Sequence, residues 1–479
     1  MRPTSHARPL TGRSARRVTP AFSLLTVATA TALTLSGCGG GSTKGEFSLP
    51  TAAGYFKTAC PKAAEKPAQK ELTYWSMWTK DEPQGKVLQY VINCFEKQTG
   101  VKVNVQWLGR KLLTQNVAPA LNTSSVPDLF DEDVTKLKAA IEEPGGAMPL
   151  DDVLGMKTGE GDKTVKDVLA KSSWDYPEAK DEHGKIFLVP YTLLVNGWWY
   201  NKKATKNVKP PKTMDQLFAL FDAAKKNGKA AISLDGDINT YNIYYFSTLA
   251  ERYVGAGGLM KAAKDKTGKS WTAEPGFLKA AQYVQRIAQG RYLIDGWDAS
   301  KFPQVQDRWA DGQAAYIYLG SWGPSETREY LTKQGGGQTI SYGSFQMPLP
   351  PGAEHDIVEQ KPIGFSVAKK AKHPDAAKAF IAYFLNKKML AGIPAVADNL
   401  TPRPDLPVPA DLKEINQAMN DPKKEHALFQ DGTDALNGGT WADNVLFPEN
   451  NALLKGKITA RQFVNQMAAK SASYWKSQH

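Results

Sequence analysis

The side chains that stand out for their chemistry are aromatic rings that lie beside small and polar residues. The chain of 479 residues contains 12 Trp and 18 Tyr. Trp322 lies within Gly-Ser-Trp-Gly-Pro, Trp441 follows Gly-Gly-Thr, and further rings occur at Trp75, Trp78 and Trp198-Trp199. Flat rings combined with Asp, Asn and Gln suit a sugar, because its C–H faces stack on indole while its hydroxyls need directed acceptors. Any one Trp could equally fill a core, but the set predicts a sugar-binding surface.

A second reactive group is the thiol of Cys38. Residues 1–37 begin with five arginines and continue as an uncharged run, as an export signal does. Leu35-Ser36-Gly37-Cys38 resembles a bacterial lipobox, in which the Cys is acylated and becomes the new N-terminus. We therefore predict lipidation at Cys38, with a plain secretory signal as the alternative. Arg16-Arg17 leaves the export route open between the general and the twin-arginine pathway.

Two further cysteines, Cys60 and Cys94, remain after Cys38. Outside the cytoplasm a pair of thiols is more often bridged than free. The sequence predicts a Cys60–Cys94 disulfide that joins an N-terminal extension to the first helix, and two buried free thiols are the alternative. Three cysteines without C-x-x-C spacing or histidine partners predict no zinc site.

Signatures of catalysis or of cofactor binding are incomplete wherever they begin. The chain has no H-E-x-x-H and no G-x-S-x-G sequence. Thr267-Gly268-Lys269-Ser270 resembles the end of a phosphate-binding loop, but Ala263 replaces its leading glycine. Asp235–Asn239 begins like a calcium loop, yet Thr240 and Phe246 replace its turn glycine and its last carboxylate. We predict no catalytic residue, no metal site and no cofactor.

The formal charge of +12 is unevenly distributed. Five of these charges come from arginines before Cys38, which leaves +7 for the rest of the chain. The remaining lysines are interspersed with acids and form no stripe with aromatic residues. We therefore expect no nucleic-acid partner.

The elements that must position these residues alternate between strands and helices. Leu72–Trp78 has the composition of a buried strand, residues 87–95 carry a helical apolar face, and residues 101–105 alternate as a second strand. This succession requires a crossover and so a parallel pairing. Capping boxes are predicted at Thr213–Gln216 and Thr459–Gln462, and Tyr244-Tyr245 is predicted in a helix core. Further strands are predicted at 185–190, 195–200 and 363–367. The fold class is α/β.

Several short motifs follow one another in chain order between about Leu72 and Lys470. They include Phe95-Glu96-Lys97-Gln98-Thr99-Gly100, Val126-Pro127-Asp128-Leu129-Phe130, Trp199-Tyr200-Asn201-Lys202-Lys203, Ala310-Asp311-Gly312-Gln313-Ala314-Ala315 and Gly320-Ser321-Trp322. Together they resemble extracellular solute-binding proteins of family 1, the maltose-binding-protein-like sugar receptors of ABC transporters. The independent lipobox agrees with that resemblance.

The resemblance implies a two-lobed periplasmic-binding-protein-like fold of type II, with discontinuous lobes joined by a hinge. It implies an N-lobe of residues 71–192 and 365–429, a C-lobe of residues 193–364 and 430–479, and a tether and extension at 38–70. Crossings between lobes are expected near 189–196, 361–368 and 429–432. The implied ligand-binding residues are Trp75, Trp78, Asp131, Asp133, Tyr191, Asn196, Tyr241, Trp322 and Trp441. Leu194 replaces an acidic residue of the maltose receptor, which argues against maltose as the ligand.

The predicted function is that of a lipid-anchored receptor on the extracytoplasmic face of a bacterial membrane. It would bind a mono- or oligosaccharide as a monomer and deliver it to the permease subunits of an ABC importer, without catalysis. Two alternatives remain. One is a secreted carbohydrate-active hydrolase or lyase, and the other is the same fold with a polyamine, ferric ion, phosphate ester or peptide as its ligand.

Overall fold

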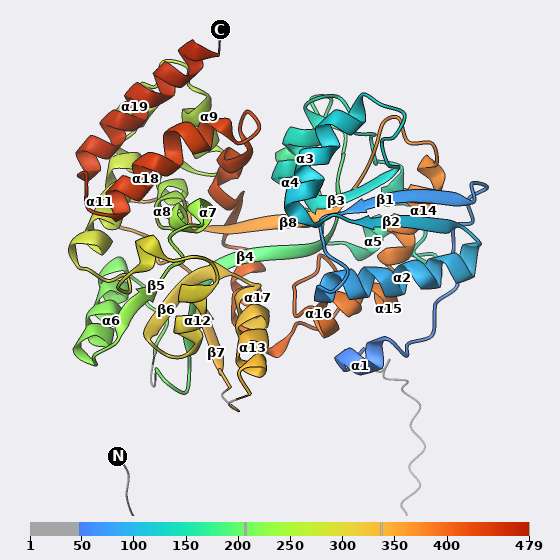
Figure 1. Cartoon of the computed structure of the whole chain (residues 1–479), viewed down its shortest axis with the longest axis horizontal. Coiled ribbons are helices and arrows are strands. Elements are labelled where there is room, and N and C mark those ends of the chain that lie inside the picture. The colour runs from blue at the N-terminus through green and yellow to red at the C-terminus, as the bar shows by residue number, and fades with distance from the viewer. Residues whose placement is uncertain (1–46, 206–207, 336, 338, 479) are drawn as a thin grey trace, which may run out of the picture. The chain divides into compact units, whose positions relative to one another are not determined.

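The fold consists of strands that join one mixed sheet and helices that cover it. The structure is a computed structural model and describes residues 47–205, 208–335, 337 and 339–478. The strands are β1 Glu71–Ser76, β2 Lys102–Trp107, β3 Leu129–Asp133, β4 Val189–Asn201, β5 Ala230–Ser233, β6 Ala314–Gly320, β7 Tyr342–Phe345, β8 Ile357–Val367 and β9 Glu425–Leu428. They pair in the order β2-β1-β3-β8-β4-β6-β5, with β7 also on β4 and β9 also on β8 (Figure 1). The α/β class predicted from the sequence is confirmed.

One large core surrounds β1, β2 and β3, which pair in parallel. We call this part the N-lobe. Helix α2 begins with Pro83 at its first turn and ends at Gly100, whose φ of 73° closes the helix as glycine can. Its apolar side chains pack into this core, as the sequence predicted. The N-lobe helices are α1 Ala52–Tyr55, α2 Pro83–Thr99, α3 Gly109–Leu121, α4 Val134–Leu137, α5 Val165–Val168, α14 Pro374–Phe384, α15 Lys387–Leu390 and α16 Gly392–Val396.

A second core, which defines the C-lobe, lies around β5, β6 and β7. Here β5 pairs with β6 in parallel, and β6 and β7 flank β4 in antiparallel pairing. Tyr244 and Tyr245 are buried in α8, as predicted. The C-lobe helices are α6 Met214–Lys226, α7 Asn239–Asn242, α8 Tyr244–Val254, α9 Gly258–Lys264, α10 Ser270–Ala273, α11 Pro275–Gln289, α12 Gln304–Ala310, α13 Gly323–Lys333, α17 Lys413–Met419, α18 Phe447–Leu454 and α19 Ala460–Ser477.

Two long strands, β4 and β8, belong to both lobes. The first half of β4 pairs with β8 from Val189↔Phe365 to Val195↔Gln360, and its second half pairs with β6 from Asn196↔Gly320 onward. Figure 1 shows both strands running between the two groups of helices. The sequence predicted two separate strands at 185–190 and 195–200, but a single strand spans 189–201. The two lobes are thus connected by continuous strands.

Side chains of β4 alternate between two C-lobe cores. Trp198 packs into the core around β5 to β7, whereas Trp199 packs on the other face of the sheet with Leu319 and Ile415. Both indoles are buried, and the Trp199 Nε1–H donates to the Leu319 carbonyl at 2.9 Å. The interpretation of Trp198-Trp199 as exposed rings was therefore wrong, because both faces of this sheet are covered.

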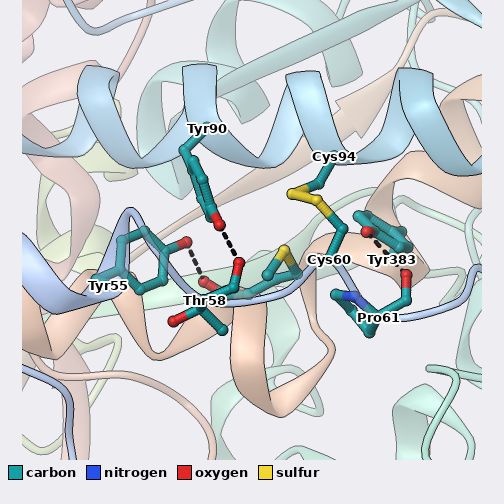
Figure 2. Close-up of a disulfide and its surroundings, with 8 residues drawn as sticks. Tyr55, Thr58, Cys60, Pro61, Tyr90, Cys94 and Tyr383 are labelled. Atoms are coloured by element: carbon teal, nitrogen blue, oxygen red, sulfur yellow. Dashed lines mark hydrogen bonds between the residues drawn. A yellow bond between two sulfur atoms is a disulfide. The ribbon is translucent and has the colours of Figure 1, made fainter.

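The N-terminal extension is tied to the N-lobe by the predicted Cys60–Cys94 disulfide, whose Cα atoms lie 5.3 Å apart. Figure 2 shows that tyrosines on both sides of the bridge also hold the extension. The Tyr383 hydroxyl donates to the Pro61 carbonyl at 3.1 Å, the Tyr90 hydroxyl donates to the Thr58 carbonyl, and Tyr55 of the extension donates to the Met389 carbonyl at 2.7 Å. Residues 47–62 thus form a strap, the name used below, that adheres to α2, α14 and α15.

The two predicted capping boxes differ in the structure. At Thr459 the full capping box is present, whereas at Thr213 only the hydroxyl accepts from Gln216 N, and the Gln216 side chain instead accepts from Lys212 N.

None of the helices among the described residues has the length and apolar character needed to cross a bilayer.

Candidate functional site

A cavity of about 520 Å³ lies between the two lobes. The N-lobe contributes the loop after β1 and the end of β3, and the C-lobe contributes α7 and the start of α13. Side chains of β4 and β8 form the floor between them. The lining residues are Met77, Trp78, Glu82, Pro83, Gln84, Arg110, Glu132, Asp133, Lys136, Leu194, Ile238, Tyr241, Phe302, Trp322, Ser325, Glu326, Glu329, Lys361, Ile363 and Asn399.

The cavity lies where parallel strands end. In the N-lobe, β1 ends at Ser76 and β3 at Asp133, and in the C-lobe β5 ends at Ser233 and β6 at Gly320. Carboxyl ends of parallel strands share one edge of a sheet, and ligands of open α/β folds bind there. Both lobes thus turn their strand ends toward the same cavity.

Three aromatic rings from the C-lobe line one side. The rings of Tyr241 and Trp322 have centroids 6.0 Å apart and planes inclined by 31°. Phe302 meets Tyr241 edge-on at 6.3 Å and is 40% exposed. Partly exposed rings of this kind offer flat apolar surface beside polar groups. We call these three residues the ring platform.

The Trp322 indole lies directly over Gly320. A Cβ atom at Gly320 would lie 1.8 Å from Cζ3 of the Trp322 ring, far inside contact distance. Glycine at the end of β6 therefore permits the position of the ring.

On the N-lobe side, Trp78 belongs to a buried hydrogen-bond chain. Its Nε1–H donates to the Tyr191 hydroxyl at 2.6 Å, which in turn donates to Asp131 Oδ2 at 2.6 Å. The second oxygen of Asp131 accepts from Met77 N at 3.1 Å. Burial raises the pKa of Asp131 to about 6, against the hydrogen bond from Tyr191. Asp131 and Tyr191 fix the wall of the cavity from behind it.

The face of the Trp78 ring is covered in this structure. The guanidinium of Arg110 lies 4.6 Å from the ring centroid, and its Nη1 is 2.8 Å from Glu82 Oε1. Trp78 itself is only 3% exposed. A ligand on this side of the cavity meets Arg110 before it meets the indole.

Alternating charges extend along the bottom of the cavity. Asp133 caps α4 by accepting from Lys136 N, and the Lys136 Nζ lies 3.5 Å from Asp133 Oδ2. Burial alone would raise the pKa of Asp133, but the charges of Lys361 and Lys136 hold it well below its usual value. Lys361 in turn lies 3.1 Å from Asp434 Oδ2.

Two other carboxyl groups of the cavity have raised pKa values, whereas that of Asp133 is lowered. Burial raises the pKa of Glu132 to about 7, with the charge of Lys136 in opposition. Burial likewise raises the pKa of Glu326 to about 7, against a hydrogen bond from Gln306. Glu132 comes from the N-lobe and Glu326 from the C-lobe, so each side of the cavity presents one such group.

Segments from the three regions that were expected to cross between the lobes meet at the carboxylate of Glu359, which lies on β8. It accepts from Asn196 Nδ2 of β4 at 3.3 Å and from Gln430 N of the third crossing at 3.1 Å, and also from the Thr248 hydroxyl of α8. Gln430 has a φ of 52°, as has its neighbour Asp431 at 51°. The Glu359 carboxylate thus connects the three crossings with α8.

The structure brings Trp78, Asp133, Tyr241 and Trp322 together at the cavity and places Asp131 and Tyr191 directly behind its wall. Trp75 and Asn196 line no part of it. Trp75 is in β1 and packs edge-on against Phe130, while Asn196 is bonded to Glu359.

Trp441 requires a correction. It is 0% exposed, stacks on Trp271 with ring centroids 6.2 Å apart, and its Nε1–H donates to Ser471 at 3.3 Å. The Gly-Gly-Thr sequence before it indicated an exposed loop, but the chain turns inward at Trp441 and the indole fills the C-lobe core.

Sequence reasoning missed most of the charged lining, above all Arg110, Glu326 and Lys361. Glu326 carried one usable signal, because it lies one helical turn after the predicted Trp322. Lys361 stands at the start of a predicted crossing. Arg110 lies on a helix that no motif marked, and only the fold brings it over Trp78. No cluster of three or more His, Cys, Asp or Glu suited to a metal occurs among the residues described here.

Comparison with protein families and known proteins agrees with this geometry. Residues 79–391 match the family described as bacterial extracellular solute-binding protein. The diacetylchitobiose binding protein NgcE of Streptomyces coelicolor is 25% identical over 291 residues, which cover 58% of this chain and 59% of that protein. The match therefore spans about three-fifths of that relative's length.

Solved structures are similar over a larger part of the chain. A protein from Caldanaerobius polysaccharolyticus, studied for xylan utilization, superimposes with a TM-score of 0.66 at 18% identity, over 84% of this chain and 99% of its own. A Bacillus licheniformis sugar transporter in complex with stachyose gives 0.62 at 20% identity, over 84% and 99%. These likenesses concern the two-lobed fold.

Proposed function

We propose, from the premise that this chain belongs to the bacterial extracellular solute-binding proteins, that it binds a carbohydrate between its lobes and delivers it to an ABC importer. The observation that carries the proposal is one cavity lined by the ring platform from the C-lobe and by carboxylates from both lobes. Rings stack on the C–H faces of sugars, and carboxylates accept from their hydroxyls. NgcE is named for the carbohydrate diacetylchitobiose, which supports this ligand class.

The lobes are proposed to close on the sugar about β4 and β8. We assign residues 71–192 and 365–409 to the N-lobe, and residues 193–364 and 430–479 to the C-lobe. Residues 412–419, which were expected in the N-lobe, are assigned to the C-lobe because Leu412 and Ile415 pack with Trp199 of β4. A ligand that contacts both lobes favours the closed form through its higher affinity for that form.

Binding is proposed to occur without catalysis. A hydrolase is the second candidate, because Glu132 and Glu326 share one cavity and both have a raised pKa. General acid–base work needs both groups within hydrogen-bond reach of substrate. Glu132 is only 2% exposed, and one of its oxygens accepts from the backbone N of Asp133 at 3.0 Å. This buried position suits a fixed part of the cavity wall better than a group that exchanges protons with a substrate.

Membrane attachment is proposed through acylated Cys38, which lies outside the described residues. The permease subunits and the extracytoplasmic location follow from the proposed import function. A Cys38→Ser variant should leave the membrane fraction and appear in the medium of the expressing cells. Retention of that variant on membranes would contradict the anchor and leave sugar binding untouched.

A calorimetric screen of mono- and oligosaccharides tests the proposed function. At least one sugar should bind, and at a concentration of one hundred times its dissociation constant it should add about 2.7 kcal/mol to the free energy of unfolding. Release of reducing sugar from the same panel is measured in parallel. Turnover of a bound sugar would favour the hydrolase, and a panel without any binding would contradict the proposed ligand class.

A further inference from the structure

The charges that line the interlobe cavity do not balance. Carboxylates outnumber cations, and both lobes contribute to the excess. The carboxylates are Glu82, Glu132, Asp133, Glu326 and Glu329, and the cations are Arg110, Lys136 and Lys361. The cavity therefore carries a formal surplus of negative charge, although the chain as a whole is basic.

Each cation already has a carboxylate partner. Arg110 is 2.8 Å from Glu82, Lys136 is 3.5 Å from Asp133, and Lys361 is 3.1 Å from Asp434. An anionic ligand would have to compete with these partners inside a cavity that is already acidic. The charge of the site thus disfavours a phosphate ester or another anion, which the net charge of the sequence had left possible.

Two carboxylates are left with little compensation. Within the described part of the chain, Glu326 has no cation within 4.0 Å, and its Oε2 accepts from the neutral Gln306 amide at 2.8 Å. Arg110 lies near enough to lower the pKa of Glu326, but its hydrogen bond goes to Glu82. Glu132 shares Lys136 with Asp133 at the longer distance of 4.0 Å. Its Oε2 is buried and has no hydrogen-bond partner among the residues that the structure describes.

Glu326 stands beside the ring platform. Trp322 immediately precedes α13, and Glu326 follows it by four residues, with its backbone N donating to the Trp322 carbonyl at 3.2 Å. Residues four apart on a helix lie on the same face. The Trp322 ring and the Glu326 carboxylate thus line the same part of the cavity.

We propose that this cavity selects, among carbohydrates, a sugar with a free protonated amine, such as glucosamine or a short oligomer of it, with Glu326 as the anionic partner. The inference rests on the proposed sugar-binding function. An ammonium group offsets part of the surplus charge and donates charge-assisted hydrogen bonds, which are about twice as strong as neutral ones. A hydroxyl or an acetylated amine at the same position can also donate to the carboxylate, but it brings no positive charge.

The protonation behaviour of the site supports this choice. Burial raises the pKa values of Glu132 and Glu326 to about 7, and the charges of Lys136 and Arg110 oppose this rise without cancelling it. A bound ammonium supplies a further positive charge. Such a charge beside Glu326 would stabilise the ionised form of its carboxylate.

The test compares three matched sugars by calorimetry at pH 7: glucosamine, glucose and N-acetylglucosamine, together with their oligomers of equal length. The amine should bind at least tenfold more tightly than either neutral counterpart. Glu326→Gln should remove most of this preference, because it should weaken binding of the amine far more than binding of the neutral sugars. Glu354→Gln, at a position outside the cavity, is the matched control and should retain the preference. The melting temperature of each variant without ligand shows that it is folded.

The outcomes are distinguishable. Equal affinities for the amine and its neutral counterparts would overturn the inference and leave sugar binding in place. Failure of every sugar to bind would overturn the proposed function itself. A preference for the amine that persists in Glu326→Gln would overturn the assignment to Glu326.

Discussion

At the residue scale, the position of the Trp322 ring depends on the absent side chain of Gly320. Gly320→Ala places a methyl group where the indole now lies, so the Trp322 ring must leave its present position. We expect sugar affinity to fall about tenfold or more, as for loss of a stacking contact. Calorimetry checks the affinity, and an unchanged affinity would mean that this ring position plays no part in binding.

Truncation of two tryptophans should separate binding from folding. Trp322→Ala should weaken sugar binding about tenfold to a thousandfold, because the ring is partly exposed at the cavity. Trp441→Ala should instead cost about 3 to 5 kcal/mol of folding stability, because its ring is buried against Trp271. Denaturant unfolding and calorimetry on both variants measure the two quantities. The assignment fails if Trp322→Ala is the variant that destabilises while binding normally.

The sequence around a single ring does not by itself decide whether that ring lines the cavity. Trp322 and Tyr241 reach the cavity as expected. Trp441 has a similar local sequence, yet its loop turns into the core, and no local pattern distinguishes the two. Arg110 is distant in the chain from every residue of the ring platform, so only tertiary structure places it in the site.

At the element scale, the three crossings are joined at Glu359, and Glu251 lies in the same buried region of α8. Both oxygens of Glu251 lack a hydrogen-bond partner in the described part of the chain. Burial, together with the charges of Glu359 and Asp431, raises the pKa of Glu251 well above its usual value. The folded state therefore binds this proton more tightly than the unfolded state does.

The raised pKa of Glu251 in the folded state predicts that the free energy of unfolding depends on pH. Above the usual glutamate pKa of about 4.5, stability should decline as pH rises toward the folded-state pKa, because only the folded state resists losing the proton. Glu251→Gln should remove this contribution, so the variant should gain stability over the natural chain as pH rises from 5 to 8. Denaturant unfolding across that range measures the difference. Glu71→Gln, at an exposed position, is the control and should show no such trend.

The strap gives a second prediction at this scale. Cys60→Ser with Cys94→Ser opens a loop of 34 residues, for which loop entropy predicts a loss of about 3 to 4 kcal/mol. The tyrosine hydrogen bonds should still hold the chain folded, with faster hydrogen exchange confined to the strap. Mass spectrometry after exchange locates the change, and reduction of the natural protein should reproduce it. An unaltered melting temperature would show that the bridge contributes nothing.

Helices and strands were predictable from the sequence where a single hydrophobic periodicity dominated. The apolar face of α2 and the alternation of β2 follow directly from their sequences. The continuity of β4 through residues 191–194 was not predictable, because Pro190 and the polar residues near it indicated the end of a strand. A bulge between Pro190 and Thr192 lets the strand continue through these residues.

At the scale of the whole molecule, closure requires that the sugar contact both lobes. Small-angle scattering should show a smaller radius of gyration with saturating sugar, because the lobes turn toward each other about β4 and β8. Trp322→Ala removes one of the two contact surfaces and should reduce this compaction even when the sugar is saturating. A radius of gyration that does not respond to bound sugar would exclude closure as the response.

The strap also decides how mechanical load enters the molecule. Tension that arrives at Phe47 is borne first by the hydrogen bonds of Tyr55 and Tyr90 and then by the Cys60–Cys94 bond, which transmits it to α2. Neither β4 nor β8 lies on that route, so the pivot remains unloaded. In the proposed anchored receptor the N-lobe is thus held in place by the membrane tether, and the C-lobe is the part that moves.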